Sequence, residues 1–230
     1  MKNFFLAMFL FSFLSGCDTD QDSVQLDLEN ATKVELWSTI YYVLEAPASG
    51  SAGSIPLRDM RENVIGPSLS AKDWCLAAIE GTVSVEDVVF NYAGVRNPRQ
   101  TRCSHRPSER VRWKKSKYPY GEGSSDNPLV PMISLACDLG TVSNSKPWLD
   151  GGYPEFGQII YIPEADGVLL PDGNTHDGRF RCDDVGGAIT GNHIDVFIGR
   201  ASGSSDALMR NPFKFVASNP EKTFTAYVLP

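Results

Sequence analysis

The 230-residue sequence contains no apolar run beyond residue 17 that is long enough to cross a bilayer as a helix, which excludes a polytopic membrane protein. It also lacks an excess of basic residues, because 21 Lys and Arg stand against 28 Asp and Glu and give a net charge of −7. A general nucleic-acid binder needs positive charge to attract phosphates, so this class is excluded. Histidine is scarce, at three residues, and no CxxC pair or Cys/His cluster has zinc spacing, so we expect no metal site.

The N-terminal segment is typical of an exported protein. Lys2 precedes an apolar run at residues 4–14, and two small residues stand directly before Cys17. A positive start, a short apolar run and a small-residue exit indicate a secretory signal peptide that is too short for a stable span. The quartet LSGC at residues 14–17 resembles the bacterial lipobox, in which the Cys thiol is diacylated and becomes the mature N-terminus. The alternative is a plain signal peptide followed by an unpaired Cys17.

Lipidation at Cys17 would place the mature chain in the cell envelope, tethered to a bacterial membrane and facing the periplasm. In enterobacteria an Asp after the lipidated Cys resembles an inner-membrane retention signal, and Asp18 fits that pattern, but the inner and outer membranes both stay open. Residues 18–32 are acidic and polar, which predicts a flexible tether. We expect a single domain over residues 33–230, because a composition of 42% hydrophobic and 10% aromatic residues is typical of globular proteins.

Export also changes the interpretation of the cysteines. With Cys17 acylated, four cysteines remain in an oxidising compartment: Cys75, Cys103, Cys137 and Cys182. An even number in an exported chain favours two disulfides. Four cysteines allow three pairings, and the sequence does not choose among them.

Short strand-like runs separated by Gly and Pro dominate the sequence. Residues 34–43 are rich in β-branched and aromatic side chains, which predicts a strand, and residues 82–90 predict another. Between them, Ser70 and Asp73 form a capping box and Gly81 a helix end, so we expect a short helix there. Further strands are expected at residues 132–136, 158–162, 167–170, 178–182, 194–198 and 224–229. Many short strands with one or two short helices indicate a mainly β barrel.

The segment 96–128 differs from the rest of the chain in its charge. Nine basic residues lie between Arg96 and Lys117 against one acid, Glu109, and aromatic residues are interleaved with them. One hypothesis is a basic, aromatic flap over an anionic polymer such as a carboxylate-bearing glycan. The other is a solvated insertion loop whose charges offset the acidic remainder. The sequence favours neither.

The chemistry is expected in the segment Asp184–Asp195, DVGGAITGNHID. Three glycines in six residues let the backbone turn tightly and approach a ligand closely. Residues 194–198 then alternate as a half-buried strand does, so if the isoleucine face packs against the core, Asp195 points into a cleft. Asp184, at the end of the preceding strand, would reach the same cleft. Two neighbouring carboxylates do not ionise equally, and the one that stays protonated suits a general acid near neutral pH.

DVGGAITGNHID matches the pattern D-x-G-G-A-I-x-G-x-x-x-D and resembles the signature of the three-aspartate (3D) domain. That domain occurs in lytic transglycosylases of the membrane-bound A type and in related peptidoglycan-cleaving proteins. Its remaining aspartate lies in an A-x-D segment, to which ACD at residues 136–138 is similar, and YIP at residues 161–163 matches the strand that follows. TIYY at residues 39–42 is similar to a Tyr-Tyr strand that lines the glycan groove of such enzymes. The resemblance covers residues 129–229 well and the earlier part loosely.

The resemblance implies a six-stranded double-psi β-barrel with long loop insertions and a glycan groove. The aspartate at the Asp195 position is then the single acid/base, while Asp184 and Asp138 would raise its pKa and orient the sugar. The substrate-binding residues carried over from the matching motifs are Tyr41, Tyr42, Gly186, Gly187, Ala188 and Gly191. Thr190 stands where the family commonly has Lys, and His193, in a variable position of the motif, is interpreted as a surface or hydrogen-bonding residue. The resemblance implies no metal and no other cofactor.

Together these observations predict a monomeric, lipid-anchored lytic transglycosylase that acts on peptidoglycan glycan strands. It would cleave the β-1,4 bond from MurNAc to GlcNAc, and the MurNAc 6-hydroxyl would attack C1 and leave a 1,6-anhydro end. An ordinary glycosidase needs a second carboxylate, whereas here the substrate's own hydroxyl replaces the water. The alternative is a non-catalytic, expansin-like module that binds cell-wall glycan, since a fold does not fix a function. A third hypothesis is an envelope protein whose basic flap docks a partner.

Overall fold

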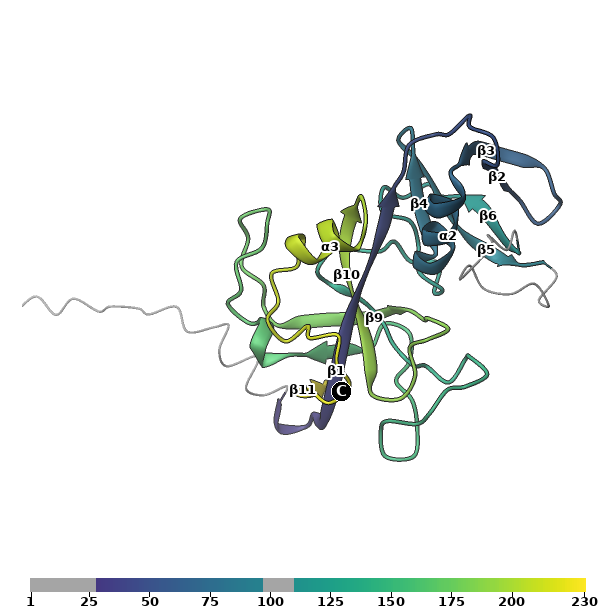
Figure 1. Ribbon diagram of the computed structural model, residues 1–230. Helices are drawn as coiled ribbons and strands as arrows, with labels where there is room; N and C mark the ends of the chain where they lie inside the picture. The colour runs from purple at the N-terminus through teal and green to yellow at the C-terminus, as the bar shows by residue number, and fades with distance from the viewer. Residues whose placement is uncertain (1–27, 97–109) are drawn as a thin grey trace, which may run out of the picture.

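The computed structural model describes residues 28–96 and 110–230 (Figure 1). The expected signal peptide, the lipidated Cys17 and most of the acidic tether therefore lie outside the described residues, as do Cys103 and the middle of the basic segment. No helix in the described part of the chain is long and apolar enough to cross a membrane. The described residues form a β-barrel and a second lobe that share one long strand.

Six strands close into the barrel. They are β1 (Thr32–Glu45), β7 (Ser134–Ala136), β8 (Ile159–Tyr161), β9 (Arg179–Asp184), β10 (His193–Ala201) and β11 (Phe224–Val228). Their order is β10-β7-β9-β8-β11-β1, and β1 pairs with β10 to close the ring. The pairs β1–β10 and β7–β9 are parallel, and the other neighbours are antiparallel. The predicted fold class, a mainly β, six-stranded double-psi barrel with one or two short helices, is confirmed.

The second lobe lies between β1 and β7 in the sequence and near the end of β1 in space (Figure 1). Its elements are β2 (Ile55–Arg58), β3 (Val64–Leu69), α2 (Ala71–Glu80), β4 (Thr82–Val85), β5 (Val88–Val95) and β6 (Val111–Lys115). β4 continues the barrel sheet, because Leu44 near the end of β1 pairs with Val83. β5 and β6 follow β4 in antiparallel order, and β2 and β3 pair separately.

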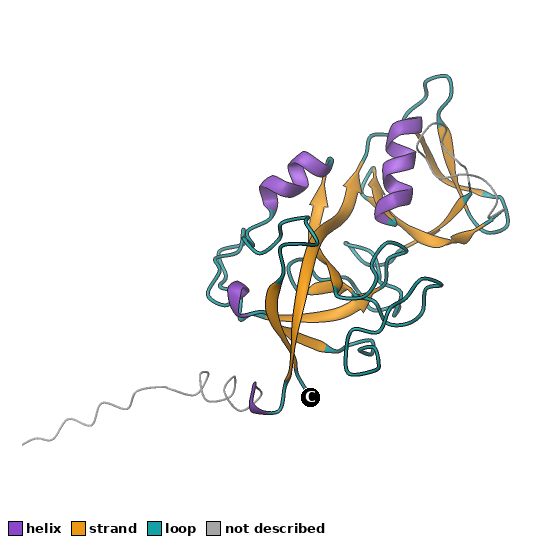
Figure 2. Cartoon of the chain, turned by 60° about the horizontal axis from the view of Figure 1, so that its bottom comes forward, coloured by secondary structure: helices purple, strands orange, loops and turns teal. Residues whose placement is uncertain are grey.

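The helices are short and α2 is capped as the sequence predicted. The hydroxyl of Ser70 accepts the backbone N–H of Asp73 at the start of α2, and Gly81 ends the helix with a φ of 80°. That left-handed conformation favours glycine, which has no Cβ to clash with the preceding turn. α3 (Ser204–Arg210) follows β10, and the 3-10 turn η1 (Pro163–Ala165) follows β8 (Figure 2).

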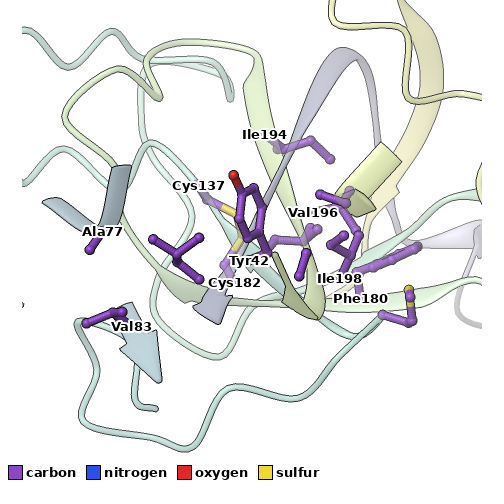
Figure 3. Close-up of a cluster of buried hydrophobic side chains, with 14 of the residues drawn as sticks. Tyr42, Ala77, Val83, Cys137, Phe180, Cys182, Ile194, Val196 and Ile198 are labelled. Carbon is purple, nitrogen blue, oxygen red and sulfur yellow. A yellow bond between two sulfur atoms is a disulfide. The ribbon is translucent and has the colours of Figure 1, made fainter. Parts of the chain in front are cut away.

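The main hydrophobic core fills the barrel and continues into the second lobe (Figure 3). Ile194 and Val196 of β10 are fully buried in it together with Phe180 of β9. Burial of an aliphatic or aromatic side chain contributes about 1.5–3 kcal/mol to folding. In the second lobe, Trp74 of α2 packs edge-on against Trp113 of β6, with ring centroids 6.2 Å apart. The core side of β10 is therefore the isoleucine face, as the alternation predicted.

A disulfide between Cys137 and Cys182 lies within this core, and both cysteines are fully buried. It represents one of the three pairings that the sequence left open. Cys75 is disulfide-bonded as well. Because Cys182 belongs to β9 and Cys137 directly follows β7, the bond fastens together the two strands that lead to Asp184 and Asp138.

Two of the expected strands differ in the structure. Residues 82–90 do not form one strand, because Glu86 and Asp87 adopt φ angles of 50° and 63° and turn the chain from β4 into β5. Two successive residues at positive φ form the tight turn that suits a β-hairpin. Residues 167–170 form no regular strand, since only an isolated bridge to a later residue is made there.

The basic segment 96–128 is not a continuous loop. Its residues 111–115 form β6, and Arg112 in this strand is largely buried beside Glu62, with the guanidinium 2.8 Å from the carboxylate. A solvated insertion loop was one of the two hypotheses for this segment, whereas pairing with an acid allows Arg112 to enter the interior. β2, β3 and α3 were also not anticipated from the sequence.

Candidate active site

A row of four residues crosses neighbouring strands of the barrel. Thr39 of β1 pairs in register with Asp195 of β10, which in turn pairs with Ala136 of β7. On its other side Ala136 pairs with Asp184 of β9. Neighbouring strands lie about 4.8 Å apart, and residues in register present their side chains to the same face. The two aspartates therefore flank Ala136 on neighbouring strands, with an irregularity in the β7–β9 pairing next to Asp184.

The row lies on the face of β10 that points away from the main core. Phe197, two residues beyond Asp195, packs in a second hydrophobic cluster with Tyr41 and not in the main core. The hydroxyl of Thr39 donates to Oδ1 of Asp195 at 2.8 Å and fixes the direction of the carboxyl group. Asp195 thus points where the strand alternation predicted.

The carboxyl group of Asp195 titrates near neutral pH. Burial raises its pKa to about 7; the Thr39 hydroxyl opposes this rise and the charge of Asp184 adds to it. The ordinary pKa of an aspartate is about 3.9, at which the group would be almost fully ionised at neutral pH. With a pKa near 7 the group both donates and accepts a proton under the same conditions.

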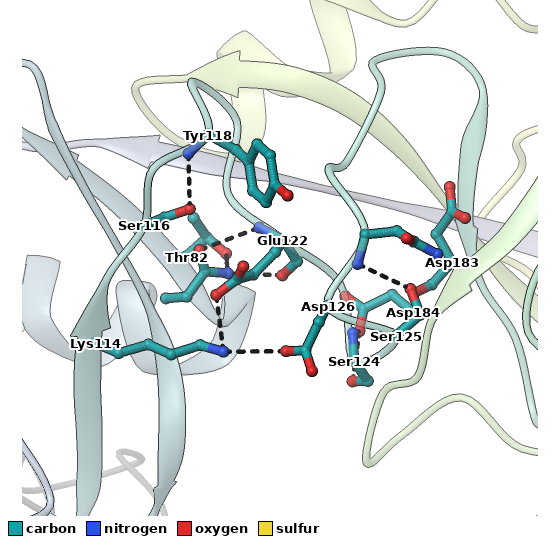
Figure 4. A network of polar contacts seen from close by, with 12 residues as sticks. Thr82, Lys114, Ser116, Tyr118, Glu122, Ser124, Ser125, Asp126, Asp183 and Asp184 are labelled. Atoms are coloured by element: carbon teal, nitrogen blue, oxygen red, sulfur yellow. Dashed lines mark hydrogen bonds and ion pairs between the residues drawn. The ribbon is translucent and has the colours of Figure 1, made fainter.

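Asp184 is held by a loop that the sequence analysis did not identify. Ser124 donates its backbone N–H and its hydroxyl to Oδ1 of Asp184, and Val185 donates its N–H to the same oxygen (Figure 4). Burial raises the pKa of Asp184, and these three donors oppose that rise. The neighbouring Ser125 donates instead to the backbone carbonyl of Asp183.

The loop that carries Ser124 is fastened to the second lobe. Asn91 of β5 exchanges hydrogen bonds of 2.8 and 3.2 Å with the backbone of Glu122, and Lys114 of β6 forms a 2.8 Å ion pair with the Glu122 carboxylate (Figure 4). A Cβ added at Gly123 would lie 2.3 Å from the carbonyl oxygen of Asp183, so the loop packs directly on β9. The position of Asp184 therefore depends on both lobes. The run GEGSS at residues 121–125 is the sequence pattern that could have indicated such a close approach.

The adjacent acid, Asp183, has a structural place. It is fully buried, accepts a hydrogen bond from Ser134 and forms a 2.6 Å ion pair with Arg181. A buried carboxylate needs such partners to offset its loss of solvation. Asp184, which keeps the D-x-G-G spacing, is the acid that joins the row.

Asp138 does not join the row. Its carboxylate accepts backbone N–H groups from Gly140, Lys146 and Gly191, the last two at 2.7 Å. Burial raises the pKa of Asp138, but the N–H donors outweigh this effect, and the pKa lies below its ordinary value. Among its hydrogen bonds within residues 28–96 and 110–230, none reaches Asp195. Asp138 therefore clamps the glycine turn that precedes Asp195.

The glycine turn connects β9 to β10 and combines tight packing with exposed backbone. A Cβ added at Gly186 would lie 2.6 Å from the side chain of Ile189, and Gly191 has a φ of 63°. Both positions therefore favour glycine. Gly187 and Ala188, in contrast, are exposed at the tip of the turn.

The two tyrosines of β1 point to opposite faces, as successive strand residues do. Tyr42 lies in the main core (Figure 3), with its hydroxyl 3.3 Å from that of Ser204. Tyr41 belongs to the second cluster, and its buried hydroxyl has no hydrogen-bond partner among the described residues. Burial, followed by the charges of Asp184 and Asp195, raises the pKa of Tyr41 well above its ordinary value. The structure brings Tyr41 to the acid row and leaves Tyr42 in the core.

A further carboxyl group comes from the second lobe. Glu80, the last residue of α2, accepts the backbone N–H of Tyr42 at 3.1 Å. Burial raises the pKa of Glu80 to about 8; the Tyr42 N–H opposes this rise and the charge of Asp195 adds to it. A single acid at the end of a helix has no sequence pattern that distinguishes it, so Glu80 was not anticipated. In the described part of the chain, no group of three or more His, Cys, Asp or Glu side chains is arranged to hold a metal ion.

No protein-family model matches the chain, and no curated protein does. MltA from Escherichia coli with bound chitohexaose matches with a TM-score of 0.56 at 17% identity, covering 87% of this chain and 75% of that one. A membrane-bound lytic murein transglycosylase from Agrobacterium tumefaciens matches with a TM-score of 0.54 at 14% identity, covering 91% of this chain and 79% of that one.

The chain has the MltA fold. At 17% identity the likeness to MltA concerns the fold alone, so the chemistry has to be argued from the site. The resemblance to lytic transglycosylases inferred from the aspartate and glycine motif is confirmed at the level of this fold. Both the barrel and the second lobe take part in the match to MltA, because it extends over 87% of the chain.

Proposed function

We propose that the protein is a lytic transglycosylase that cleaves the β-1,4 bond from MurNAc to GlcNAc in peptidoglycan. One observation carries the proposal: on an MltA-like barrel, Asp195 has its pKa raised to about 7 and lies in the same row across the strands as Asp184. A group that must act as acid and then as base works best when its pKa lies near the ambient pH. Asp195 meets this requirement.

In this mechanism Asp195 carries out both proton transfers. The protonated carboxyl group donates to the glycosidic oxygen as the C1–O bond breaks, and GlcNAc leaves with a free 4-hydroxyl. The MurNAc 6-hydroxyl then attacks the oxocarbenium-like C1, and its proton returns to the carboxylate. The new C1–O6 bond closes the 1,6-anhydro ring, no water is consumed, and Asp195 ends in its starting state.

The other acids would then have supporting roles. The hydrogen bonds from Ser124 favour the ionised form of Asp184 against the burial that raises its pKa. In that form its charge would raise the pKa of Asp195 and stabilise positive charge that develops on the sugar ring. Asp138 holds the glycine turn, whose exposed residues Gly187 and Ala188 are available to contact the glycan. A hydrolase would need a second carboxylate free to activate water or attack C1. The carboxylates of Asp184 and Asp138 both accept several hydrogen bonds from the protein, which supports a mechanism with Asp195 as the single acid/base.

The proposal includes the cellular setting. Residues 1–17 would be a lipoprotein signal peptide with Cys17 lipidated, and residues 18–32 a tether, so that a monomeric barrel faces the periplasm from the inner or the outer membrane. Glycan strands of peptidoglycan are the proposed partner. The bound chitohexaose in E. coli MltA, whose fold this chain shares, supports a glycan as the substrate class.

The test uses the full chain in detergent, incubated with peptidoglycan sacculi, and mass spectrometry of the soluble products. We expect the wild type to release 1,6-anhydro-muropeptides and Asp195→Asn to release none above background. Asp87→Asn, at the exposed turn between β4 and β5, is the matched control and should behave as the wild type. Products with reducing ends would show hydrolysis instead. Co-sedimentation with the sacculi without any release would show a glycan-binding module.

A further inference from the structure

His193, Thr39 and Asp195 form a chain of hydrogen bonds that the proposed reaction does not yet use. Nε2 of His193 lies 2.9 Å from Oγ1 of Thr39, and the same hydroxyl donates to Oδ1 of Asp195 at 2.8 Å. On the other side of the ring, Nδ1 of His193 lies 3.3 Å from the carbonyl oxygen of Ala188, which accepts a hydrogen bond only when Nδ1 carries the hydrogen. The ring is buried and stacks on Trp37, with centroids 3.5 Å apart and an interplanar angle of 8°. Its position is therefore fixed.

The hydroxyl of Thr39 has one hydrogen, so it donates to only one of its two neighbours. When it donates to Asp195, its oxygen has to accept from His193, which requires a hydrogen on Nε2. When His193 carries its hydrogen on Nδ1, it donates to the Ala188 carbonyl, Thr39 donates to Nε2, and Oδ1 of an ionised Asp195 loses its donor. Burial lowers the pKa of His193, which favours the neutral ring with one hydrogen to place. The tautomer of His193 thus decides whether Thr39 donates to Asp195.

We propose that His193 is a positioning residue: as the Nε2–H tautomer it donates to Thr39, which directs the Thr39 hydroxyl to Oδ1 of Asp195 and leaves Oδ2 to carry the transferred proton. The inference rests on the proposed role of Asp195 as acid/base. A carboxylic acid transfers its proton only from the oxygen that faces the reacting bond, and a proton on the other oxygen is misplaced. Holding Oδ1 as an acceptor keeps the acid in its productive orientation. The Nε2–H tautomer gives up the 3.3 Å contact with Ala188 and keeps the shorter bonds of 2.9 Å to Thr39 and 2.8 Å from Thr39 to Asp195.

Two substitutions separate this role from simple packing against Trp37. His193→Phe keeps an aromatic ring for the stack but has no N–H group. His193→Gln loses the ring, but its side-chain amide can still donate to Thr39. Positioning predicts that His193→Gln retains more activity than His193→Phe, and packing predicts the reverse order.

We expect His193→Phe to lower kcat for release of anhydro-muropeptides roughly tenfold to a hundredfold, as for loss of one buried hydrogen bond. KM should stay near the wild-type value, because His193 does not contact the sugar in this proposal. Thr39→Val, which has no hydroxyl, should lower kcat to a similar extent, and Thr39→Ser, which keeps the hydroxyl, should retain most of the activity. Equal or higher activity of His193→Phe relative to His193→Gln would overturn the inference.

The pH profile gives a second readout. Without the Thr39 donor the pKa of Asp195 rises, so the alkaline limb of activity should move to higher pH in Thr39→Val and return in Thr39→Ser. The other titratable groups whose charges interact with Asp195 are Asp184 on β9, Glu80 on α2 and Tyr41 on β1, and these variants retain all of them. An unshifted limb in Thr39→Val would contradict the inference.

A third measurement is independent of activity. The chain has three histidines, and ¹⁵N shifts of the ring nitrogens distinguish the tautomers, with the His193 signal assigned by its loss in His193→Phe. We expect Nε2–H at neutral pH, and an Nδ1–H ring would overturn the inference even in an active enzyme. If the wild type does not cleave peptidoglycan, the proposed function fails. In that case two measurements still test the inference: the tautomer of His193, and a ¹³C titration of the Asp195 carboxyl group. The titration should give a higher pKa in Thr39→Val than in the wild type.

Discussion

Ser124 donates two hydrogen bonds to a single oxygen of Asp184, from its backbone N–H at 2.8 Å and from its hydroxyl at 2.7 Å. The two residues are 60 positions apart in the sequence, so the group that holds the acid comes from a loop outside the strand that bears it. Donors to a carboxylate favour its ionised form, and charge on Asp184 in turn raises the pKa of Asp195. The acidity of Asp195 is therefore set in part by Ser124.

Replacing this serine should shift the pH dependence of the reaction. In Ser124→Ala the pKa of Asp184 rises further, Asp184 is less often ionised, and the pKa of Asp195 falls. Asp195 acts as an acid only when protonated, so the alkaline limb of kcat/KM should move to lower pH. Ser125→Ala is the matched control, because that hydroxyl donates to a backbone carbonyl and not to a carboxylate. The same shift in both variants would contradict the prediction.

Gly123→Ala should disturb the site without touching an acid. The new Cβ would meet the carbonyl oxygen of Asp183 at 2.3 Å, which forces the loop away from β9 and separates Ser124 from Asp184. Overpacking of this kind costs about 1–3 kcal/mol of the free energy of unfolding. Denaturant unfolding of Gly123→Ala should show this loss, whereas Gly187→Ala, with no atom within 4 Å of its added Cβ, should unfold as the wild type does.

Glu80→Gln should change how stability depends on pH. The pKa of Glu80 is about 8 in the folded protein and about 4.3 in an unfolded chain, so folding favours the protonated form. Its contribution to the free energy of unfolding is fully present below pH about 4 and is lost as the pH rises toward 8. The decline in stability from pH 5 to pH 8 should therefore be smaller in Glu80→Gln than in the wild type. Asp195 leaves a residual slope of the same sign, since its pKa is raised as well.

The control for this prediction is Glu86→Gln, at the exposed turn between β4 and β5. Chemical denaturation at the two pH values gives the difference directly for each variant. A decline in Glu80→Gln as steep as that of Glu86→Gln would show that Glu80 ionises normally in the folded state.

The double variant Cys137→Ala/Cys182→Ala should be less stable than the wild type. The bond joins residues separated by 45 positions, and closing a loop of that size restricts the unfolded chain by about 4 kcal/mol in the chain-entropy model. Urea unfolding should therefore show a lower midpoint in the double variant. Wild-type protein treated with reductant should unfold at a midpoint no higher than that of the double variant, because reduction also opens the disulfide of Cys75. A loss below about 1 kcal/mol in the double variant would contradict the prediction.

The centre of the site could be predicted because its geometry is local. Asp184 and Asp195 lie on one segment, the glycines between them require a turn, and strand alternation places Asp195 opposite the buried face of β10. Each of these properties is written in consecutive residues and depends little on the rest of the chain.

Ser124 and Glu80 could not be found in this way. Their contacts join segments far apart in the sequence. Glu80 belongs to no recognisable motif, and the glycines of GEGSS around Ser124 indicate a close approach of the backbone but not the residue that it approaches. β6 was hidden for a related reason: Arg112 in this strand is largely buried, and the acid that pairs with it, Glu62, lies on another part of the lobe. When the placement of a polar residue depends on such a distant partner, the sequence alone does not distinguish it from a polar residue on the surface.

β1 is a structural part of both lobes. Its first residues, Thr32–Leu36, pair with β11, its middle pairs with β10, and Leu44 and Glu45 pair with β4. The second lobe is therefore an insertion and not a detachable module. A fragment that starts after Glu45 would expose an unpaired edge of β4, and such an edge is a template for aggregation. Any exchange of this lobe between homologous barrels, by recombination or by protein engineering, has to carry the end of β1 with it.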